Sequence, residues 1–465
     1  MYARTSNLRV RNGHGHHRVT FVELFFDLVF VFAITQLSHG LLAHLTPIGA
    51  LETALLMIAV WWAWIDTTWL TNWLDPEKMP VRLLLFALML FGLVLSVSIP
   101  KAFADRGIPF ALAYAAMAVT RNLFMLWALK NHDANNHRNF IRITIWHLSA
   151  VLFWLAGAFF DPPIRIALWA VAVGIDSIAP IVGFHVPGMG RSSTTDWAVE
   201  GGHMAERAAL FVIIALGESI LVTGATFADL KWSAETIGAF LVSFAGSIAM
   251  WAVYFNVGAE RGSQTIASSA DPGRLARSGY TYIHILIVAG IIVAAVGDEL
   301  VLHHPHGHTE LKAAIVLLGG PAIYLLGNGW FKWLSAPYFP LSHMIGLAML
   351  GLLIPVATIA SPLILSSATT AVLIIVAVWE SISLGGSHKS QGHGIFKRRG
   401  LLRSIAVRPE PARVCPSSRP PDPSGSGCAA RCRRTACACL PRRGSRPRAA
   451  SGTAPDPSTD NRCRT

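Results

Sequence analysis

The stretch VTFVELFFDLVFVFAITQLSHGLL, residues 19–42, is long and apolar enough to cross a lipid bilayer as one helix. It nevertheless carries two acids, Glu23 and Asp27, four positions apart and therefore on one helical face. An ionisable group inside a membrane costs at least about 2.5–3.5 kcal/mol, so two of them need a compensating reason. This stretch predicts an integral membrane protein with buried acidic groups.

The composition of the whole chain agrees with that prediction. Of its 465 residues 53% are hydrophobic and only 14% are charged, whereas about 25% of the residues of a soluble domain are charged. A β-barrel would show short alternating segments in place of long unbroken apolar runs. The sequence therefore predicts an all-α polytopic membrane protein.

Hydropathy predicts about twelve transmembrane helices, with residues 19–385 as the membrane domain. The expected helices cover about 19–42, 49–71, 81–100, 107–130, 139–160, 162–184, 203–226, 233–257, 274–300, 310–331, 341–360 and 364–385.

The first and seventh of these helices resemble each other. FVFAITQLS at 30–38 matches FVIIALGES at 211–219, and an aromatic cluster follows in the next helix of each half, at 61–64 and at 251–256. Parallel repeats of this kind occur in transporters. We therefore expect two six-helix repeats, about 19–184 and 203–385.

The charges outside the helices predict the orientation. Residues 1–18, a basic N-terminal segment, and the loops on the same side hold most of the Lys and Arg that flank the helices. By the positive-inside rule this side is cytoplasmic, which places both termini in the cytoplasm.

Residues 386–465 differ from the rest of the chain. The tail is basic and rich in Pro and Arg, and it cannot bury enough apolar surface to fold alone, so we expect disorder. It holds all of the cysteines, which are Cys415, Cys428, Cys432, Cys437, Cys439 and Cys463. Their spacing matches no zinc pattern, so we expect neither a metal site nor a cofactor.

Three separated blocks carry a family resemblance. They are VELFFDLVFVFAITQLSH (22–39), WWAWIDTTWLTNWLDP (61–76) and ERAALFVIIALGESIL (206–221). Together they resemble the bacterial low temperature requirement A (LtrA) family over about residues 18–385. The resemblance implies a polytopic inner-membrane protein without an established biochemical activity.

A fainter similarity concerns FFDLVFVFAIT at 25–35, which looks like the Phe-Ser-Asp first helix of two-repeat endolysosomal-type potassium channels. Phe26 stands where those channels have the serine. The seventh helix has only Leu210-Phe211 and no equivalent motif.

The candidate site residues are the ionisable groups inside the predicted helices. Glu23, Asp27, Asp66 and Glu218 are the expected ion or proton pathway, and Arg121, Asp176 and Arg207 are the expected counter-charges. Helix rise places Arg121 about 13 Å deep, close to the roughly 12 Å of Asp27 and Asp176, so either acid is its expected partner. The alternative is a fixed ion-pair network of Arg121, Asp27 and Glu23.

Glu218 differs from the other acids because no basic residue is expected near its depth. It either meets a cation or proton, or it is protonated and hydrogen-bonded to Thr35 or Gln36. The histidines at 14, 16 and 17 and those at 303, 304, 306 and 308 are expected to lie in solvated loops. The tryptophans Trp61, Trp62, Trp64, Trp69 and Trp73 are expected to serve packing.

We therefore expect a transporter or channel for a small cation or a proton-coupled solute, with the lipid bilayer as its surroundings. The alternative is a non-transporting scaffold, sensor or regulator whose buried charges form structural ion pairs. No catalytic signature indicates an enzyme, and nucleic acid is not an expected partner. Aromatic and small-residue faces are compatible with a homo-oligomer.

Overall fold

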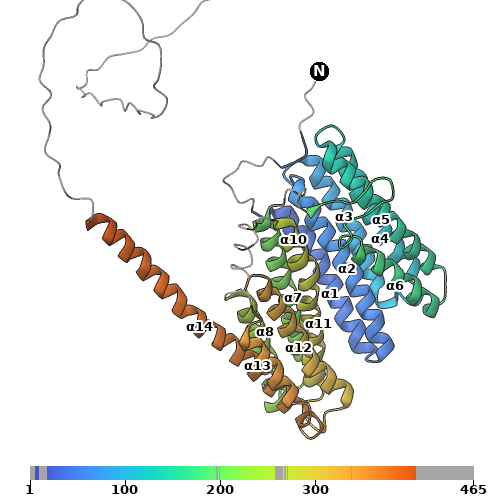
Figure 1. Ribbon diagram of the computed structural model, residues 1–465. Helices are drawn as coiled ribbons and strands as arrows, with labels where there is room; N and C mark the ends of the chain where they lie inside the picture. Colours follow the sequence, from blue (N-terminus) through green and yellow to red (C-terminus); the bar gives the residue numbers. More distant parts are fainter. Residues whose placement is uncertain are drawn as a thin grey trace, which may run out of the picture. The chain divides into compact units, whose positions relative to one another are not determined.

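The computed structural model describes residues 6–9, 18–194, 197, 199–256, 265, 269, 271–336 and 338–404, with side chains up to residue 383. Within these residues the protein is a set of α-helices without β-strands (Figure 1). The predicted all-α fold is therefore confirmed.

Three helices of the first half begin with a Pro at their first or second residue. Pro47, Pro80 and Pro162 each lie in a first turn, where their missing N–H is not needed. This half consists of α1 (Phe21–Ala43), α2 (Pro47–Trp73), α3 (Met79–Ser98), η1 (Ile99–Lys101), α4 (Gly107–Leu129), α5 (Ala134–Ala158) and α6 (Pro162–Ile178).

The second half contains a π-helical turn, η3 (Arg277–Ile283), between α10 (Pro272–Ala276) and α11 (His284–His303). Its remaining elements are α7 (Gly201–Asp229), α8 (Ala234–Phe255), α12 (Leu311–Leu334), α13 (Leu341–Leu352), η4 (Val356–Thr358) and α14 (Pro362–Ser404).

Ten helices of the described residues are long and apolar enough to cross a membrane. The other two predicted spans also contain helices, but α6 has 17 residues and α13 only 12. Twelve residues span about 18 Å, less than the roughly 30 Å of a hydrocarbon core. The predicted helix over 341–360 ends early because Pro355 disfavours helical geometry in the residue before it.

Helix pairing follows one order in both halves. α1 packs on α2 and α3, and α3 packs on α4; correspondingly, α7 packs on α8 and α11, and α11 packs on α12. Two six-helix repeats would produce this order, and the repeat itself stays a prediction. The halves meet along α1, which contacts α7 and α11.

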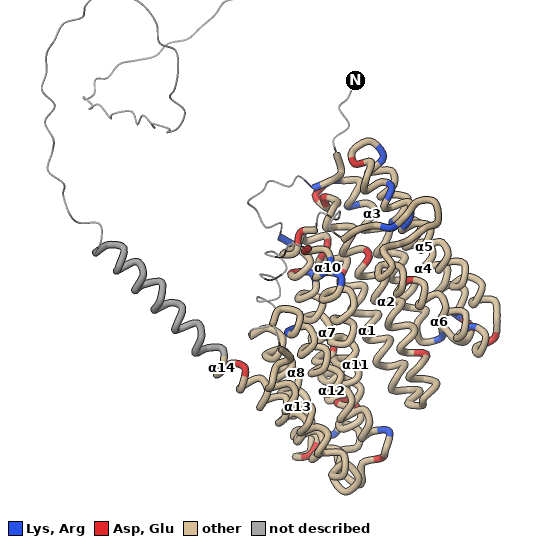
Figure 2. The backbone as a smooth tube through the Cα atoms, in the orientation of Figure 1, with Lys and Arg blue, Asp and Glu red and all other residues tan. Residues whose placement is uncertain are grey.

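Charged residues are sparse along the helices and gather towards their ends, as Figure 2 shows. Large apolar side chains such as Leu90, Leu152 and Ile213 are exposed on the outer faces of the helices, as contact with lipid requires. Trp61 and Trp64 are buried, which confirms the packing role expected for them.

Some predictions concern segments that the structure describes only in part. α14 continues to Ser404, so the first residues of the predicted tail are helical. The tail cysteines and the histidines at 14, 16 and 17 lie outside the described residues.

Candidate functional site

Glu23 lies at the start of α1, where it closes a capping box with Thr20. Its Oε1 lies 2.8 Å from Nε2 of His203, and its Oε2 lies 3.4 Å from Nη2 of Arg9. Arg9 also donates from Nε to the carbonyl oxygens of Thr71 and Leu74, at the end of α2. Glu23 is fully buried, and its carboxylate already has a cationic partner.

Asp27, one turn deeper in α1, pairs with Arg207 of α7. Nη2 of Arg207 lies 2.8 Å from Oδ1 of Asp27, and both side chains are fully buried. The same oxygen accepts a hydrogen bond from Trp64 Nε1 at 2.8 Å. Oδ2 of Asp27 and the Nε and Nη1 atoms of Arg207 have no hydrogen-bond partner within the described residues. Arg207 therefore compensates the charge of Asp27.

Arg121 pairs with neither of its expected partners. Its Nη2 lies 2.6 Å from Oδ2 of Asp66, which connects α4 to α2. Asp176 instead accepts a hydrogen bond from the hydroxyl of Tyr114 at 2.7 Å. The predicted pairing of Arg121 with Asp27 or Asp176, and the fixed Arg121–Asp27–Glu23 network, are therefore wrong. α1 packs directly on α7, whereas α3 lies between α1 and α4.

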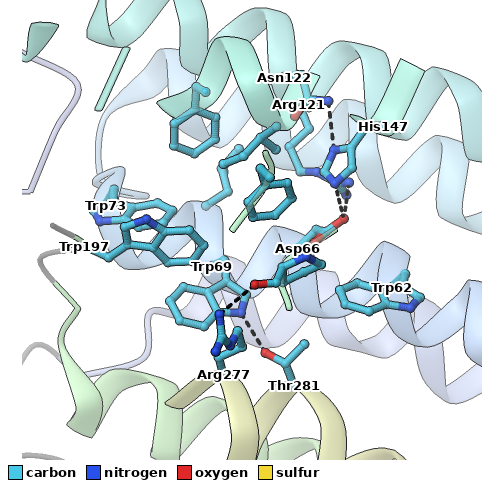
Figure 3. Close-up of a pocket in the computed structure, with 15 residues that line it drawn as sticks. Trp62, Asp66, Trp69, Trp73, Arg121, Asn122, His147, Trp197, Arg277 and Thr281 are labelled. Carbon is cyan, nitrogen blue, oxygen red and sulfur yellow. Dashed lines mark hydrogen bonds and ion pairs between the residues drawn. The ribbon is translucent and has the colours of Figure 1, made fainter. Parts of the chain in front are cut away.

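The Asp66–Arg121 pair forms one wall of a cavity between α2, α4, α5 and η3 (Figure 3). Nε2 of His147 lies 3.7 Å from Oδ2 of Asp66. The side-chain amide of Asn122 is 3.0 Å from the other ring nitrogen of His147. The cavity measures about 50 Å³. Its lining consists of Trp62, Asp66, Trp69, Leu70, Trp73, Arg121, Asn122, Phe140, Ile143, His147, Pro180, Phe184, Trp197, Arg277 and Thr281.

The π-helical turn η3 supplies the opposite wall of this cavity. Trp69 donates from Nε1 to the hydroxyl of Thr281 at 2.9 Å, and Trp61 donates to the carbonyl oxygen of Thr281 at 2.7 Å. Arg277 donates from Nη1 to the carbonyl oxygen of Pro180 at 2.6 Å. Single π-helical turns inside α-helices are frequent at functional sites. Thr281 of η3 thus holds Trp61 and Trp69 of α2 in place, and Trp69 lines the cavity.

Glu218 lies in a second cavity, of about 440 Å³, between α1, α7 and α11. Its side chain is only 5% exposed, and within the described part of the chain it has neither a hydrogen bond nor an ion pair. The expected bond to Thr35 or Gln36 is not formed among the described residues, and the Thr35 hydroxyl donates to the carbonyl oxygen of Val31.

The lining of this second cavity is acidic and contains neither Lys nor Arg, as expected for the surroundings of Glu218. Its lining residues are Thr35, His39, Glu218, Leu221, Val222, Ala225, Thr226, Asp229, Glu299 and His303. Among the described residues, no three His, Cys, Asp or Glu side chains stand close enough together to hold a metal ion. The cavity therefore offers negative charge without a preformed metal site.

A buried cluster that the sequence did not indicate lies in the second half. Nζ of Lys332 is 2.6 Å from Oε2 of Glu380, and Nδ1 of His343 is 3.4 Å from Oε1 of the same side chain. Glu380 was recognisable as a deep acid, but Lys332 stands near a helix end. The contact of Arg9 with Glu23 was equally unpredictable, because Arg9 precedes the first predicted span.

Comparison with known proteins places this architecture in a family. The family model described as "Bacterial low temperature requirement A protein (LtrA)" matches residues 18–378. An uncharacterized protein of Rhizobium meliloti (strain 1021) is 40% identical over 368 residues, which cover 79% of this chain and 90% of that protein. No solved structure matches. The chain is therefore a multi-pass membrane protein that belongs to the LtrA family.

Proposed function

We propose that this protein is a membrane carrier for a small cation or a proton-coupled solute. Glu218 is the observation that supports the proposal best. It is 5% exposed, lies on the wall of a cavity of about 440 Å³, and has no partner among the described residues. Because a buried carboxylate is costly unless it is neutralised, a cation or a proton from the cavity would stabilise it.

The depth of the cavity favours a carrier over an open channel. Its lining reaches Thr35 and Glu218 but not Asp27. Phe30 and Phe211 are buried between these levels, and the Phe211 ring lies 4.2 Å from the Trp64 ring. A site that opens on one side and is closed by apolar packing on the other suits alternating access.

A non-transporting scaffold, sensor or regulator is the second candidate, and one observation favours it. Three of the four expected pathway acids have a counter-charge: Glu23 with Arg9 and His203, Asp27 with Arg207, and Asp66 with Arg121. Fixed pairs of this kind need no transported ion. In the transport proposal, these pairs hold the helices in register and Glu218 alone meets the ion.

We also propose that the protein lies in the cytoplasmic membrane with both termini in the cytoplasm. The excess of Lys and Arg on the side of residues 1–18 supports this orientation. It places the Glu218 cavity on the outer side.

The test is flux of K⁺, Na⁺ and H⁺ into proteoliposomes that contain the full chain, with Glu218→Gln beside it. Glu77→Gln is the matched control, because Glu77 is an exposed acid outside the helices. Flux that is lost in Glu218→Gln and kept in Glu77→Gln supports the proposal. Equal flux in both variants would remove Glu218 from the path. Absence of all three fluxes from folded protein would favour an organic solute or the second candidate.

A further inference from the structure

The cavity of Figure 3 has an unbalanced charge. Three charged side chains line it: Asp66, Arg121 and Arg277. One carboxylate and two guanidinium groups leave one positive charge, and a proton on His147 would add to it. Asp66 is already 2.6 Å from Arg121, so its charge is compensated. The surplus therefore belongs to Arg277.

Arg277 has donors left for a ligand. Its Nη1 donates to the carbonyl oxygen of Pro180, while its Nε and Nη2 atoms have no partner within the described residues. The side chain is only partly exposed. A planar guanidinium in this position binds a carboxylate better than any neutral group, because the hydrogen bonds are charge-assisted.

The other walls of the cavity are apolar and rigid. Trp69, Trp73 and Trp197 contact one another in tilted and edge-to-face pairs, with ring centroids 5.5–6.2 Å apart. Trp69 is fixed further by its hydrogen bond to Thr281. Such a wall accepts the apolar part of a solute without large rearrangement, since ligand pockets combine apolar walls with a few polar groups.

The size of the cavity limits the ligand. One water needs about 10–15 Å³ of such a volume, so a cavity of about 50 Å³ holds roughly three to five water-sized groups. A solute with a few non-hydrogen atoms fits, and a nucleotide or a sugar does not.

We propose that this cavity binds a small monocarboxylate, with its carboxylate at Arg277 and its apolar part against the tryptophans. The inference deepens the proposed function, because it names the class of solute for a carrier whose coupling ion binds at Glu218. That the bound monocarboxylate is transported rests on the proposed function. Binding itself is measured without flux. Failure of the carrier proposal and failure of this inference are therefore distinguishable.

The experiment is a titration of the full chain in detergent, at constant ionic strength, followed by tryptophan fluorescence. Four tryptophans line the cavity, so a bound solute should change their emission. The probes are propionate, its neutral isostere propionamide, the cation propylammonium, and sodium chloride as the salt control. Propionate should bind saturably, and propionamide at least about tenfold more weakly.

Variants locate the site. Arg277→Gln should weaken propionate binding at least about tenfold. Arg274→Gln is the matched control, because Arg274 lies one turn away with its side chain 65% exposed, and it should bind as the native protein does. The comparison of probes needs no variant, so the inference stays testable even if Arg277→Gln does not fold. Equal binding of propionate and propionamide, preference for propylammonium, or no saturable response to propionate would each overturn it.

Discussion

Replacing Asp27 by Asn should destabilise the protein through Arg207. Asp27 Oδ1 lies 2.8 Å from Nη2 of Arg207, and both side chains are fully buried. The variant keeps the shape of the side chain and an oxygen that can accept from Trp64, but it removes the negative charge. Arg207 cannot lose its proton, so an uncompensated charge would remain in the protein interior.

The structure sets the size of the effect. Removing one partner of a buried ion pair costs about 3–5 kcal/mol, mostly because the other charge is left without compensation. Removing both charges avoids that cost. We therefore expect Asp27→Asn to lower the free energy of unfolding by about 3–5 kcal/mol. The double variant with Arg207→Gln leaves no uncompensated charge and should therefore cost less than Asp27→Asn alone.

Denaturant unfolding of the full chain in detergent, followed by tryptophan fluorescence, measures these free energies as a double-mutant cycle. The control cycle combines Asp27→Asn with Arg121→Gln. Arg121 pairs with Asp66, so this second cycle should be additive within about 0.5 kcal/mol. A cost below about 1 kcal/mol for Asp27→Asn, or equal coupling of Asp27 to both arginines, would refute the reasoning.

Two further predictions concern the second half. Gly320→Ala would place a Cβ 2.7 Å from the backbone nitrogen of Ala294 and should lower the free energy of unfolding by about 1–3 kcal/mol; Gly319→Ala meets nothing within 4 Å and should be close to neutral in the same denaturant assay. Lys332→Met should cost about 3–5 kcal/mol, because Glu380 loses a partner 2.6 Å away. Adding Glu380→Gln should restore most of the stability in thermal unfolding, and a double variant no more stable than Lys332→Met would contradict the pairing.

The helices were predictable because the signal for a membrane helix is local. A run of about 20 apolar residues suffices, and ten of the twelve expected spans contain helices of sufficient length. The shortened span at α13 shows the limit of hydropathy. The sequence stays apolar through Pro355, so hydropathy extends the span beyond Leu352, where the helix ends.

The partners of the buried charges were not predictable in the same way. Helix rise gives the depth of a side chain but not which helix lies beside it. Asp27, Asp176 and Arg121 have similar depths, yet Asp27 faces Arg207 and Arg121 faces Asp66. Arg9 reaches Glu23 from a segment before the first helix, and no pattern within that segment indicates this contact.

The Figure 3 cavity depends on a feature with no local signature. Trp62, Trp69 and Trp73 recur on one face of α2 and suggest only packing. The turn Arg277–Ile283 is π-helical, and its residues Arg277 and Thr281 line the cavity opposite that face. Nothing in the residues RSGYTYI distinguishes a π-helical turn from an ordinary α-helical one.

The four acids of the expected pathway outnumber the two arginines expected inside the helices, and the ion pairs of the structure reduce this surplus. Glu23, Asp27 and Asp66 are compensated, whereas Glu218 in one cavity and the Nε and Nη2 atoms of Arg277 in the other have no partner within the described residues. One group attracts a cation or a proton, and the other attracts an anion. Together, the two proposals describe a carrier that binds a cation and a monocarboxylate at separate sites. If the cation and the monocarboxylate crossed together, no net charge would be transferred, and neither ion would cross the membrane uncompensated.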